Sequence, residues 1–457
     1  MSKESRKKEK KKLVVEMPIV NAYSAGIDVG DKEHVVAVAE GLCRERVRSF
    51  GSMSCDLEAL ASWLQECEVD TVAMESTGVY WKPLFSLLSS KGIEVYLVNA
   101  AHVRNVTGRK DDENDAMWIQ KLHSCGLLNT SYLPDDNQEA LRTIVRYRRT
   151  LLRDSTRFVN RIQKSLELMN IKFHTLIADI MGVSGQAVIQ AIISGERNSQ
   201  NFLPFIDRRV KASREAIIKS LEGNWRREHL FTLEESYQMV LTLRKHIEKC
   251  DKEIETHLQH YSARINEGEI IEAKEPDNKP QKPLRKDKNQ PQFNIDSYLK
   301  EIYGVDVLAI YGISAIGGLE ILAETGTDFS KWKDEKHFKS WLNLCPNNKI
   351  SAGKIISSKL MKKHPNAASQ AFRQAANAVQ KSDHWLGDYF RRIKTKGGNK
   401  YAIVATAGKL AAIYYKMVRN KEEFKPINVD EYQQKYKKAK IAYLERKLSK
   451  LKEQLVA

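Results

Sequence analysis

The sequence predicts an α/β domain with a mixed sheet, then a coiled-coil arm, then a mostly helical C-terminal domain. Strand-like and helix-like segments alternate between residues 23 and 130. Two later segments have apolar residues at heptad spacing, and a proline-rich stretch follows the second of them. Alternation of strands and helices favours a mixed sheet covered by helices, and heptad spacing favours helices that pack along a seam.

Length and charge indicate about three domains and a polyanionic partner. The chain has 457 residues and a formal net charge of +17, which points to nucleic acid or a membrane surface. No apolar run approaches the ~18–20 residues of a membrane span, so we expect no membrane contact of that kind.

The N-terminus and the cysteines indicate a cytoplasmic protein. Residues 1–20 form a basic tail, lysine-rich from Ser2 to Lys12 with no apolar segment behind it, which does not fit a secretory signal. A solvated tail and an arm that contacts nucleic acid both remain open. The six cysteines are scattered without a C-x-x-C pair, which argues against zinc and against a disulfide framework and suits a reducing cytosol.

The first domain is expected over residues 21–132. Its first strand ends in Gly26-Ile27-Asp28-Val29-Gly30. The stop pattern Lys91-Gly92 marks the end of a helix. The further expected elements are strands over 35–39, 44–50, 69–74 and 93–98, and helices over 57–64, 81–89 and 112–125.

Four carboxylates lie where a metal-dependent nuclease needs them. Asp28 and Glu75 each follow an apolar, strand-like run. Asp112 and Asp115 lie three residues apart at the start of a helix and therefore share a face. Such a set suits Mg²⁺ or Mn²⁺, and two ions about 3.5–4 Å apart stabilise the attacking and leaving oxygens of a phosphodiester. Taken one motif at a time, plain surface acids at strand ends are the alternative.

A helical domain with a coiled-coil arm is expected over residues 133–266. Its two seams contain Leu141, Val145, Arg148, Leu152, Ser155, Val159, Ile162, Leu166 and Met169, and then Leu233, Tyr237, Val240, Ile247, Ile254, Leu258 and Tyr261. Another stripe of the first helix is almost uniformly basic, with Arg142, Arg146, Arg149, Arg153, Arg157, Arg161 and Lys164. Like charges at this spacing repel each other, so we expect the stripe to contact a nucleic-acid backbone rather than water alone.

The remainder is expected as a linker over 267–293, a compact domain over 294–425 and a C-terminal helix over 426–457. The linker contains four of the eleven prolines and too few apolar residues to fold alone. Gly312 to Gly318 resembles a phosphate-binding helix–hairpin–helix turn, although a plain interhelical turn fits equally well. Ala367 to Val379 predicts an alanine-rich helix. A basic loop over 391–400 offers Arg391, Arg392 and Lys396 as phosphate contacts. The C-terminal helix has a short heptad that would pair with itself or dock on the body.

These motifs, in this order, resemble the DEDD-type transposases of bacterial insertion sequences, a family of bridge-RNA-guided recombinases. The matching segments are 26–28, 74–81, 98–100, 110–116, 312–326, 341–346 and 351–354. The resemblance implies a RuvC-like (RNase H-like) fold for the first domain, with Asp28, Glu75, Asp112 and Asp115 as its metal-binding acids.

The resemblance also implies a catalytic serine in the C-terminal domain. Ser351 matches it, in the segment Ser351-Ala352-Gly353-Lys354 where the family has an S-G-G-K-like motif. In the family this serine attacks the DNA phosphate and forms a covalent protein–DNA intermediate. A serine hydroxyl needs a base or a metal to become a nucleophile, and the metal site would supply that activation. Lys354 would contact nucleic acid. Ser357 and Ser358 are rival assignments.

The sequence departs from the family pattern at several points. Asp111 stands where the family usually has Thr, so it could supplement or replace a neighbouring acid. Residues 363–366 and Tyr311 to Ser314 replace the family's Lys-x-Gly-Asn-like and P-G-I-G segments. The proline-rich linker resembles an insertion.

The resulting hypothesis is an RNA-guided DNA recombinase. The expected partners are target and donor DNA, a structured noncoding guide RNA and further copies of the chain in a dimer or tetramer, in the bacterial cytoplasm and associated with the nucleoid. A RuvC-like endonuclease that uses water, and a non-catalytic nucleic-acid scaffold, are the alternatives. The four intact acids argue against the scaffold.

Overall fold

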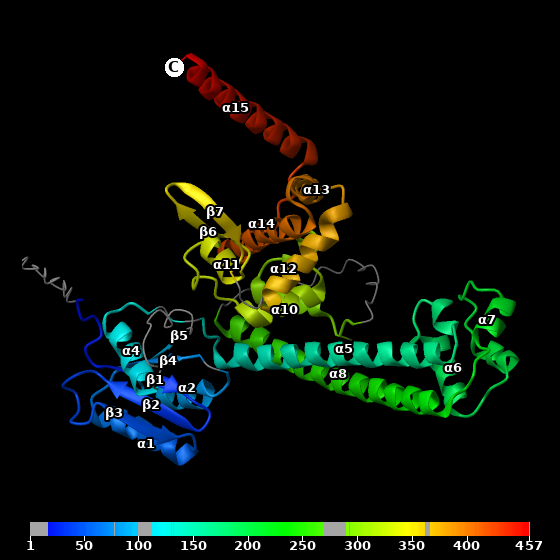
Figure 1. Ribbon diagram of the computed structural model, residues 1–457, viewed down its shortest axis with the longest axis horizontal. Helices are drawn as coiled ribbons and strands as arrows, with labels where there is room; N and C mark the ends of the chain where they lie inside the picture. Colours follow the sequence, from blue (N-terminus) through cyan, green and yellow to red (C-terminus); the bar gives the residue numbers. More distant parts are fainter. Residues whose placement is uncertain are drawn as a thin grey trace, which may run out of the picture. The chain divides into compact units, whose positions relative to one another are not determined.

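The computed structural model describes residues 17–76, 78–98, 112–128, 130, 132–268, 289–291, 293–361 and 366–456 (Figure 1). The chain divides into two compact units, Met1–Leu133 and Pro134–Ala457. Most of the expected basic tail and of the expected linker lies outside the described residues, as do Asp111 and residues 363–365. The finer division of the second unit into domains stays a prediction.

The first unit is built on a five-stranded mixed sheet in the order β3-β2-β1-β4-β5. The first three strands pair antiparallel, and β1, β4 and β5 pair parallel. The strands are β1 (Ser24–Val29), β2 (Glu33–Val38), β3 (Val47–Gly51), β4 (Thr71–Glu75) and β5 (Glu94–Val98), and the helices are α1 (Ser54–Glu66), α2 (Trp81–Ser90) and α4 (Asp112–Ser124).

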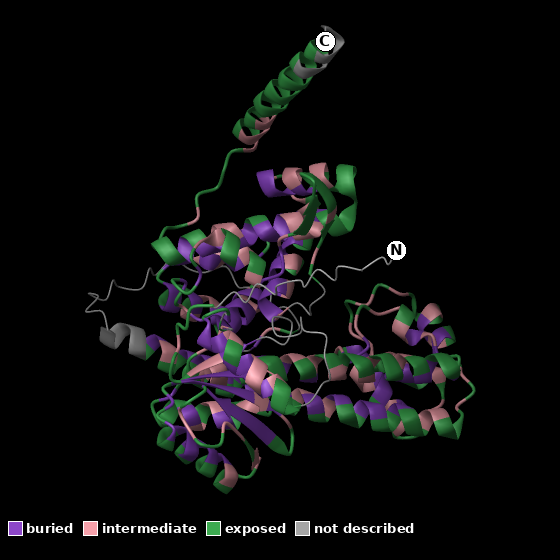
Figure 2. Ribbon diagram, turned by 60° about the vertical axis from the view of Figure 1, so that its left-hand side comes forward, coloured by how far each residue is buried: buried purple, intermediate pink, exposed green. Residues whose placement is uncertain are grey.

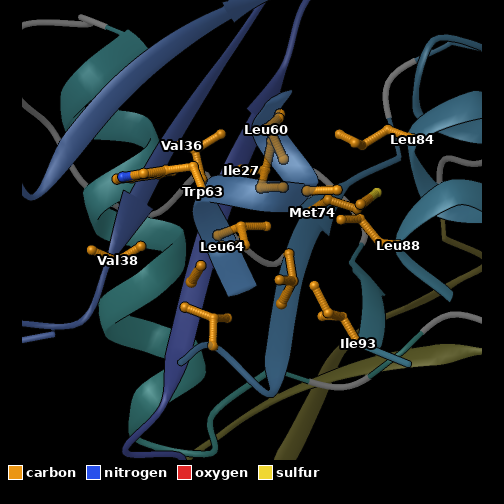
Figure 3. Packing of buried hydrophobic residues seen from close by; sticks show 14 of the residues in the cluster. Ile27, Val36, Val38, Leu60, Trp63, Leu64, Met74, Leu84, Leu88 and Ile93 are labelled. Carbon is orange, nitrogen blue, oxygen red and sulfur yellow. The ribbon is translucent and has the colours of Figure 1, made fainter. Parts of the chain in front are cut away.

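Helices cover both faces of this sheet, which is consistent with a RuvC-like fold. On one face, α1 and α2 pack on the sheet around Ile27, Leu60 and Met74, all fully buried (Figure 3). On the other face α4 packs on β1 and β2, with Ala116 against Val35 and Ala37. The predicted α/β class is confirmed, and each predicted element of the domain is present with its ends shifted by a few residues.

Gly26 allows α4 to lie directly on β1. A Cβ atom built at Gly26 would come within 2.2 Å of the Gln120 backbone nitrogen and 2.5 Å of the Ala116 carbonyl oxygen. Any larger residue would push the helix away from the strand. The glycine before Asp28 therefore fixes the distance between α4, which bears Asp112 and Asp115, and the strand that bears Asp28.

The cysteine spacing argued against a disulfide framework, but the structure has one disulfide. Cys43 and Cys67 form a disulfide, with their Cα atoms 5.5 Å apart. Cys43 follows β2 and Cys67 ends α1, and the packing of α1 on the sheet brings the two together. Spacing along the chain could not reveal this pair, because it is created by tertiary packing.

The second unit begins with a long antiparallel pair of helices, α5 (Asp136–Leu168) and α8 (Arg227–Gly268) (Figure 1). The predicted seams face each other: Leu141, Ile162 and Leu166 are buried on α5, and Leu233, Val240 and Ile254 on α8. A small helical subdomain connects them, with η1 (Phe173–Thr175), α6 (Val183–Ile193), η2 (Ser199–Phe205) and α7 (Arg214–Ser220).

A buried ion pair interrupts the apolar seam between these two helices. Arg148, at a predicted seam position, is almost fully buried and donates from Nε to Asp251 of α8. Its Nη2 donates to the carbonyl oxygen of Asn289 at 2.8 Å. The ion pair therefore joins α5 to α8 at one position of an otherwise mostly apolar seam.

The rest of the second unit is mostly helical, with one hairpin. Phe338, Phe372 and Tyr414 are fully buried at its centre. Its elements are α9 (Ile295–Tyr303), η3 (Val307–Ala309), α10 (Ala315–Thr325), α11 (Glu335–Trp341), β6 (Asn347–Ser351), β7 (Lys354–Lys359), α12 (Ala367–Ala378), η4 (Val379–Lys381), α13 (Trp385–Gly397), α14 (Asn399–Asn420) and α15 (Val429–Val456).

The glycine turn before α10 packs against other helices. Ser314 caps α10 by accepting a hydrogen bond from the Gly317 backbone nitrogen at 3.1 Å. A Cβ at Gly312 would meet the Ala375 carbonyl oxygen of α12 at 2.5 Å, and one at Gly318 would meet the side chain of Leu299 at 2.6 Å. The interhelical alternative therefore accounts for these glycines.

The expected basic loop is wrong as a loop, because Arg391 to Lys396 lie in α13. Arg391 donates to the carbonyl oxygens of Gln380 and Ser382. Arg392 lies 3.8 Å from the centre of the Tyr436 ring at the start of α15. Both arginines therefore have structural contacts, whereas Lys396 is exposed.

Beyond its first turns, where Tyr436 contacts Arg392 of α13, helix α15 is exposed along its length (Figure 2). Ile441, Leu444 and Leu448 are each more than half exposed. They form the first part of the predicted short heptad, which here has no partner among the described residues. No helix in the described part of the chain is long and apolar enough to cross a membrane.

Three of the seven basic residues in the stripe of α5 pair with acids of α10. Arg146 donates from Nε and Nη2 to the two carboxylate oxygens of Glu324, each at 2.8 Å, and Arg142 Nε lies 3.4 Å from the same carboxylate. Arg149 lies 3.5 Å from Glu320 and also donates to Gln370. These three arginines already have partners within their own unit.

Replacing Glu324 with Ala is therefore expected to destabilise the second unit. Glu324 is 2 % exposed. Its removal leaves Arg146 without the carboxylate that it contacts at 2.8 Å, and leaves the half-buried Arg142 with Glu139 alone, at 3.4 Å. Breaking a buried pair costs about 3–5 kcal/mol. Because Arg146 is 47 % exposed and can be hydrated, we expect about 2 kcal/mol. Urea unfolding of the full chain measures this, with the exposed Glu431→Ala on α15 as the control. An unchanged unfolding midpoint would show that the pair contributes nothing.

Candidate active site

The sheet brings Asp28 and Glu75 side by side. Ile27 of β1 pairs with Met74 of β4 in parallel register, so the next residue of each strand lies at the same level. Ile27 and Met74 point to the α1 and α2 face. Since side chains alternate along a strand, Asp28 and Glu75 point to the opposite face, on which α4 packs.

Helix α4 contributes the second pair of acids. Asp112 and Asp115 lie in its first turn, where the helix dipole favours negative charge. Ala116, in the next position, packs on Val35 of β2, and Val35 is the direct neighbour of Asp28 across the antiparallel pair. The first turn of α4 therefore lies beside the end of β1.

The electrostatics of Asp28 indicate that the four acids form one group. Burial, followed by the negative charges of Asp112, Glu75 and Asp115, raises the pKa of Asp28 from 3.8 to about 6. Each of the other three carboxylates thus acts on Asp28, and the ionisation of Asp28 beside them is costly when no positive charge is near. A cation among them would remove that cost.

This donor set fits a hard divalent cation. All four side chains offer carboxylate oxygens, the ligands that Mg²⁺ and Mn²⁺ prefer. Among the described residues, no three His, Cys, Asp or Glu side chains are arranged at metal-ligand geometry. The fit therefore depends on the chemistry and mutual electrostatics of the acids rather than on a formed coordination shell.

Ser351 lies at the tip of an exposed hairpin in the second unit. It ends β6 and pairs across the ladder with Lys354, the first residue of β7. Ala352 and Gly353 make the two-residue turn, with φ angles of 46° and 75°, which is the geometry of a tight hairpin turn with positive φ at both positions. Ser351 and Lys354 are both exposed. The turn therefore leaves the serine exposed at the tip of the hairpin.

The rival serines lie nearer the base of the hairpin. Ser358 donates a hydrogen bond to Asn348 Oδ1 at 2.6 Å, and Ser357 pairs with Lys349 and is half-buried. Neither occupies the tip. Sequence reasoning took Ser351 from the family motif alone, and what it missed was the turn geometry that exposes this residue.

The first unit is thus an α/β domain in which three acids act electrostatically on Asp28, and the second is a mostly helical unit with an exposed serine. The family comparisons agree. A model of the DEDD transposases of the IS110 type matches residues 25–171, and a model described as the transposase IS116/IS110/IS902 family matches residues 306–391. The chain belongs to the IS110-type DEDD transposases, enzymes that recombine DNA. Among the curated proteins none gives a significant match.

Proposed function

We propose that the chain is an RNA-guided DNA recombinase of an insertion sequence that cuts and rejoins DNA through a phosphoserine intermediate on Ser351. The observation that supports this best is the pairing of two features in one chain. Four acids act together on Asp28, and a serine is exposed at a hairpin tip, each within a segment matched by a transposase model.

In this mechanism the Ser351 hydroxyl attacks the scissile phosphate. The bond from phosphorus to the 3′ oxygen breaks, the serine oxygen becomes bound to phosphorus, and the 3′ oxygen leaves with a proton as a free hydroxyl. Asp28, Glu75, Asp112 and Asp115 would hold Mg²⁺ or Mn²⁺, which supplies charge neutralisation at the phosphate and activation of the hydroxyl. Rejoining reverses the step with a 3′ hydroxyl of the other DNA as the nucleophile.

The test uses the unmodified full chain with labelled target and donor DNA, with and without the noncoding RNA. After denaturing electrophoresis we expect labelled DNA on the protein band only when RNA is present. A protein that cuts DNA but never bears label would support the alternative, a metal-dependent endonuclease that uses water. Label that appears equally without RNA would contradict RNA guidance.

We propose that the C-terminal part of the basic stripe, from Arg153 to Arg161, contacts nucleic acid. Arg153, Arg157 and Arg161 are exposed, although Arg153 is close enough to Glu320 of α10 for its charge to act on the pKa of that carboxyl. Arg157 pairs with the half-buried Asp154 at 2.7 Å, and Arg161 lies over the Phe158 ring. A surface pair of this kind contributes little to stability, so these groups remain accessible to phosphates.

Charge reversal of Arg153, Arg157 and Arg161 to Glu is expected to weaken DNA binding and to flatten its salt dependence. Each phosphate contact contributes about 0.9 to the slope of log K against log salt on duplex DNA, so the slope should fall by roughly 2–3. Fluorescence anisotropy at several salt concentrations measures this. The same reversal at Lys437, Lys440 and Lys447 on α15 is the control. An equal loss there would show that only net charge matters.

We also propose that the chain acts as a dimer or tetramer, since recombination needs two DNA sites cut and exchanged together. The exposed apolar stripe of α15 offers a surface for self-association. Light scattering of the protein with its RNA and DNA is expected to give a multiple of 52.3 kDa for the protein content. A mass of one chain under all these conditions would contradict the proposal. Because of this function, we also propose that the protein acts in the bacterial cytoplasm, close to the nucleoid.

A further inference from the structure

A pocket lies at the base of the β6–β7 hairpin, at the opposite end of the hairpin from Ser351. It has a volume of about 480 Å³. Most of its wall is apolar, from Leu344, Pro346, Leu360, Ile393 and Val404. A pocket of this size is large enough for one nucleotide base, since small-molecule sites are about 300–1,000 Å³.

Polar and aromatic groups lie around this apolar wall. Tyr401, in the first turn of α14, is 65 % exposed although it lines the pocket, so one part of its ring is open to a ligand. Lys359 and Lys400 also line the pocket and are exposed. Among the residues that the structure describes, none of those lining the pocket is acidic. An aromatic ring with two lysines and no acid suits a base and its phosphates.

The hairpin itself is positively charged. It bears Lys349, Lys354 and Lys359, with no acidic residue between Asn347 and Lys359. Ile350, Ile355 and Ile356 are each at least 60 % exposed. The ribbon projects from the unit beside α11 and α14 (Figure 1). A basic ribbon connects the pocket to the serine, so a bound DNA strand would have lysines along its path.

We propose that this pocket holds one unstacked base of the DNA strand that is attached to, or attacked by, Ser351. The base lies on the Tyr401 ring against the apolar wall, and Lys359 and Lys400 contact its flanking phosphates. Lys359, which lines the pocket, pairs with Asn347, four positions before Ser351, a distance of about 14 Å at ~3.4 Å per residue. The held base therefore lies a short way along the strand from the scissile phosphate, and it positions that phosphate at the hairpin tip.

The inference depends on the proposed function for its DNA substrate, but its test needs no chemistry. The full chain with Ser351→Ala is mixed with single-stranded target DNA in which 2-aminopurine replaces one base at a time. Stacking on an aromatic ring quenches this fluorescent base. We expect quenching beyond that of the free oligonucleotide at one or two adjacent positions, and no such change elsewhere.

Substitutions then assign the quenching to the pocket. Tyr401→Ala is expected to remove it and to weaken binding about tenfold, because base–aromatic stacking contributes about 1–3 kcal/mol per base. Tyr401→Phe keeps the ring and should keep the quenching. Val404→Trp should fill the pocket and abolish it. Tyr443→Ala, which removes an equally exposed tyrosine of α15, is the matched control and should change nothing.

Several outcomes would overturn the proposal. They are equal quenching at all positions, quenching that survives Tyr401→Ala and Val404→Trp, and quenching seen with an RNA of the same sequence but not with DNA. The covalent adduct of the unmodified protein is scored separately. An absent adduct with position-specific quenching retained would reject the serine chemistry and leave the pocket, whereas the reverse result would reject the pocket alone.

Discussion

Replacing Asp115 with Ala is expected to reduce strand cleavage on the order of 10³-fold or more while nucleic-acid binding remains largely intact. Removal of one preorganised electrostatic group costs about 10²–10³ in rate, and a lost metal ligand also lowers occupancy of the ion. Asp115 lies in the first turn of α4 and contributes to the raised pKa of Asp28. The same loss is expected for Asp28, Glu75 and Asp112.

Glu113→Ala is the matched control for this prediction. Glu113 lies in the same turn of α4 and is exposed, but it is not among the charges that raise the pKa of Asp28. Its replacement removes an equal charge and should leave cleavage close to normal. A readout apart from activity is the binding of Mn²⁺, followed by its paramagnetic resonance signal, which should weaken for Asp115→Ala and not for Glu113→Ala.

Full cleavage by the Asp115→Ala protein would show that this acid is not part of the metal site. Asp111 would then be the next residue to replace, because it stands next to Asp112 in the sequence and differs from the family's usual Thr. A loss of cleavage together with loss of DNA binding would instead indicate a general defect of the first unit.

The sequence predicted the first domain well because its signals are local. The strands β1, β4 and β5 are mostly apolar runs of five or six residues, and segments with helical periodicity lie between them. Asp28 and Glu75 lie at the ends of two of these runs. Gly26 is informative for the same reason, since only close packing of α4 on β1 requires a residue without a side chain there. The mixed character of the sheet was predicted from the alternation of strands and helices, whereas the strand order β3-β2-β1-β4-β5 was not predicted.

What the sequence could not predict depends on contacts between distant residues. The stripe from Arg142 to Arg149 has the spacing of an exposed nucleic-acid surface, yet its arginines pair with Glu320 and Glu324, which lie some 180 positions further along the chain. Charge and periodicity describe one helix at a time, so they cannot show that a second helix neutralises it. The Cys43–Cys67 disulfide escaped prediction for the same reason.

Ser351 is a third case. The sequence around it contains a hairpin pattern, but that pattern is weak. The segment from Lys349 to Ser358 alternates too loosely to predict a hairpin, although Ala352-Gly353 is the required two-residue turn. Ala352 adopts φ of 46°, which a non-glycine residue adopts only at a cost. The family's glycine at this place would avoid that cost, so the motif has a conformational reason: it keeps Ser351 at the tip of a tight turn.

Ser351→Ala is expected to abolish the covalent protein–DNA adduct and recombination, and to spare RNA binding and Mn²⁺ binding. Adduct formation should fall below detection, because no other atom at the hairpin tip can take the place of the serine oxygen. The side chain of Ser351 is exposed, so its loss should not unfold the hairpin or the helices that support it. The measurement is denaturing electrophoresis of the protein with RNA and labelled target DNA.

Ser357→Ala and Ser358→Ala are the matched controls, because they remove the same hydroxyl from the same hairpin. Ser358 already donates to Asn348 and Ser357 is half-buried, so both variants should form the adduct. Label that persists on the Ser351→Ala protein would place the nucleophile elsewhere, with these two serines next in line. Loss of label in all three variants would show that the hairpin as a whole, rather than one hydroxyl, is what the reaction requires.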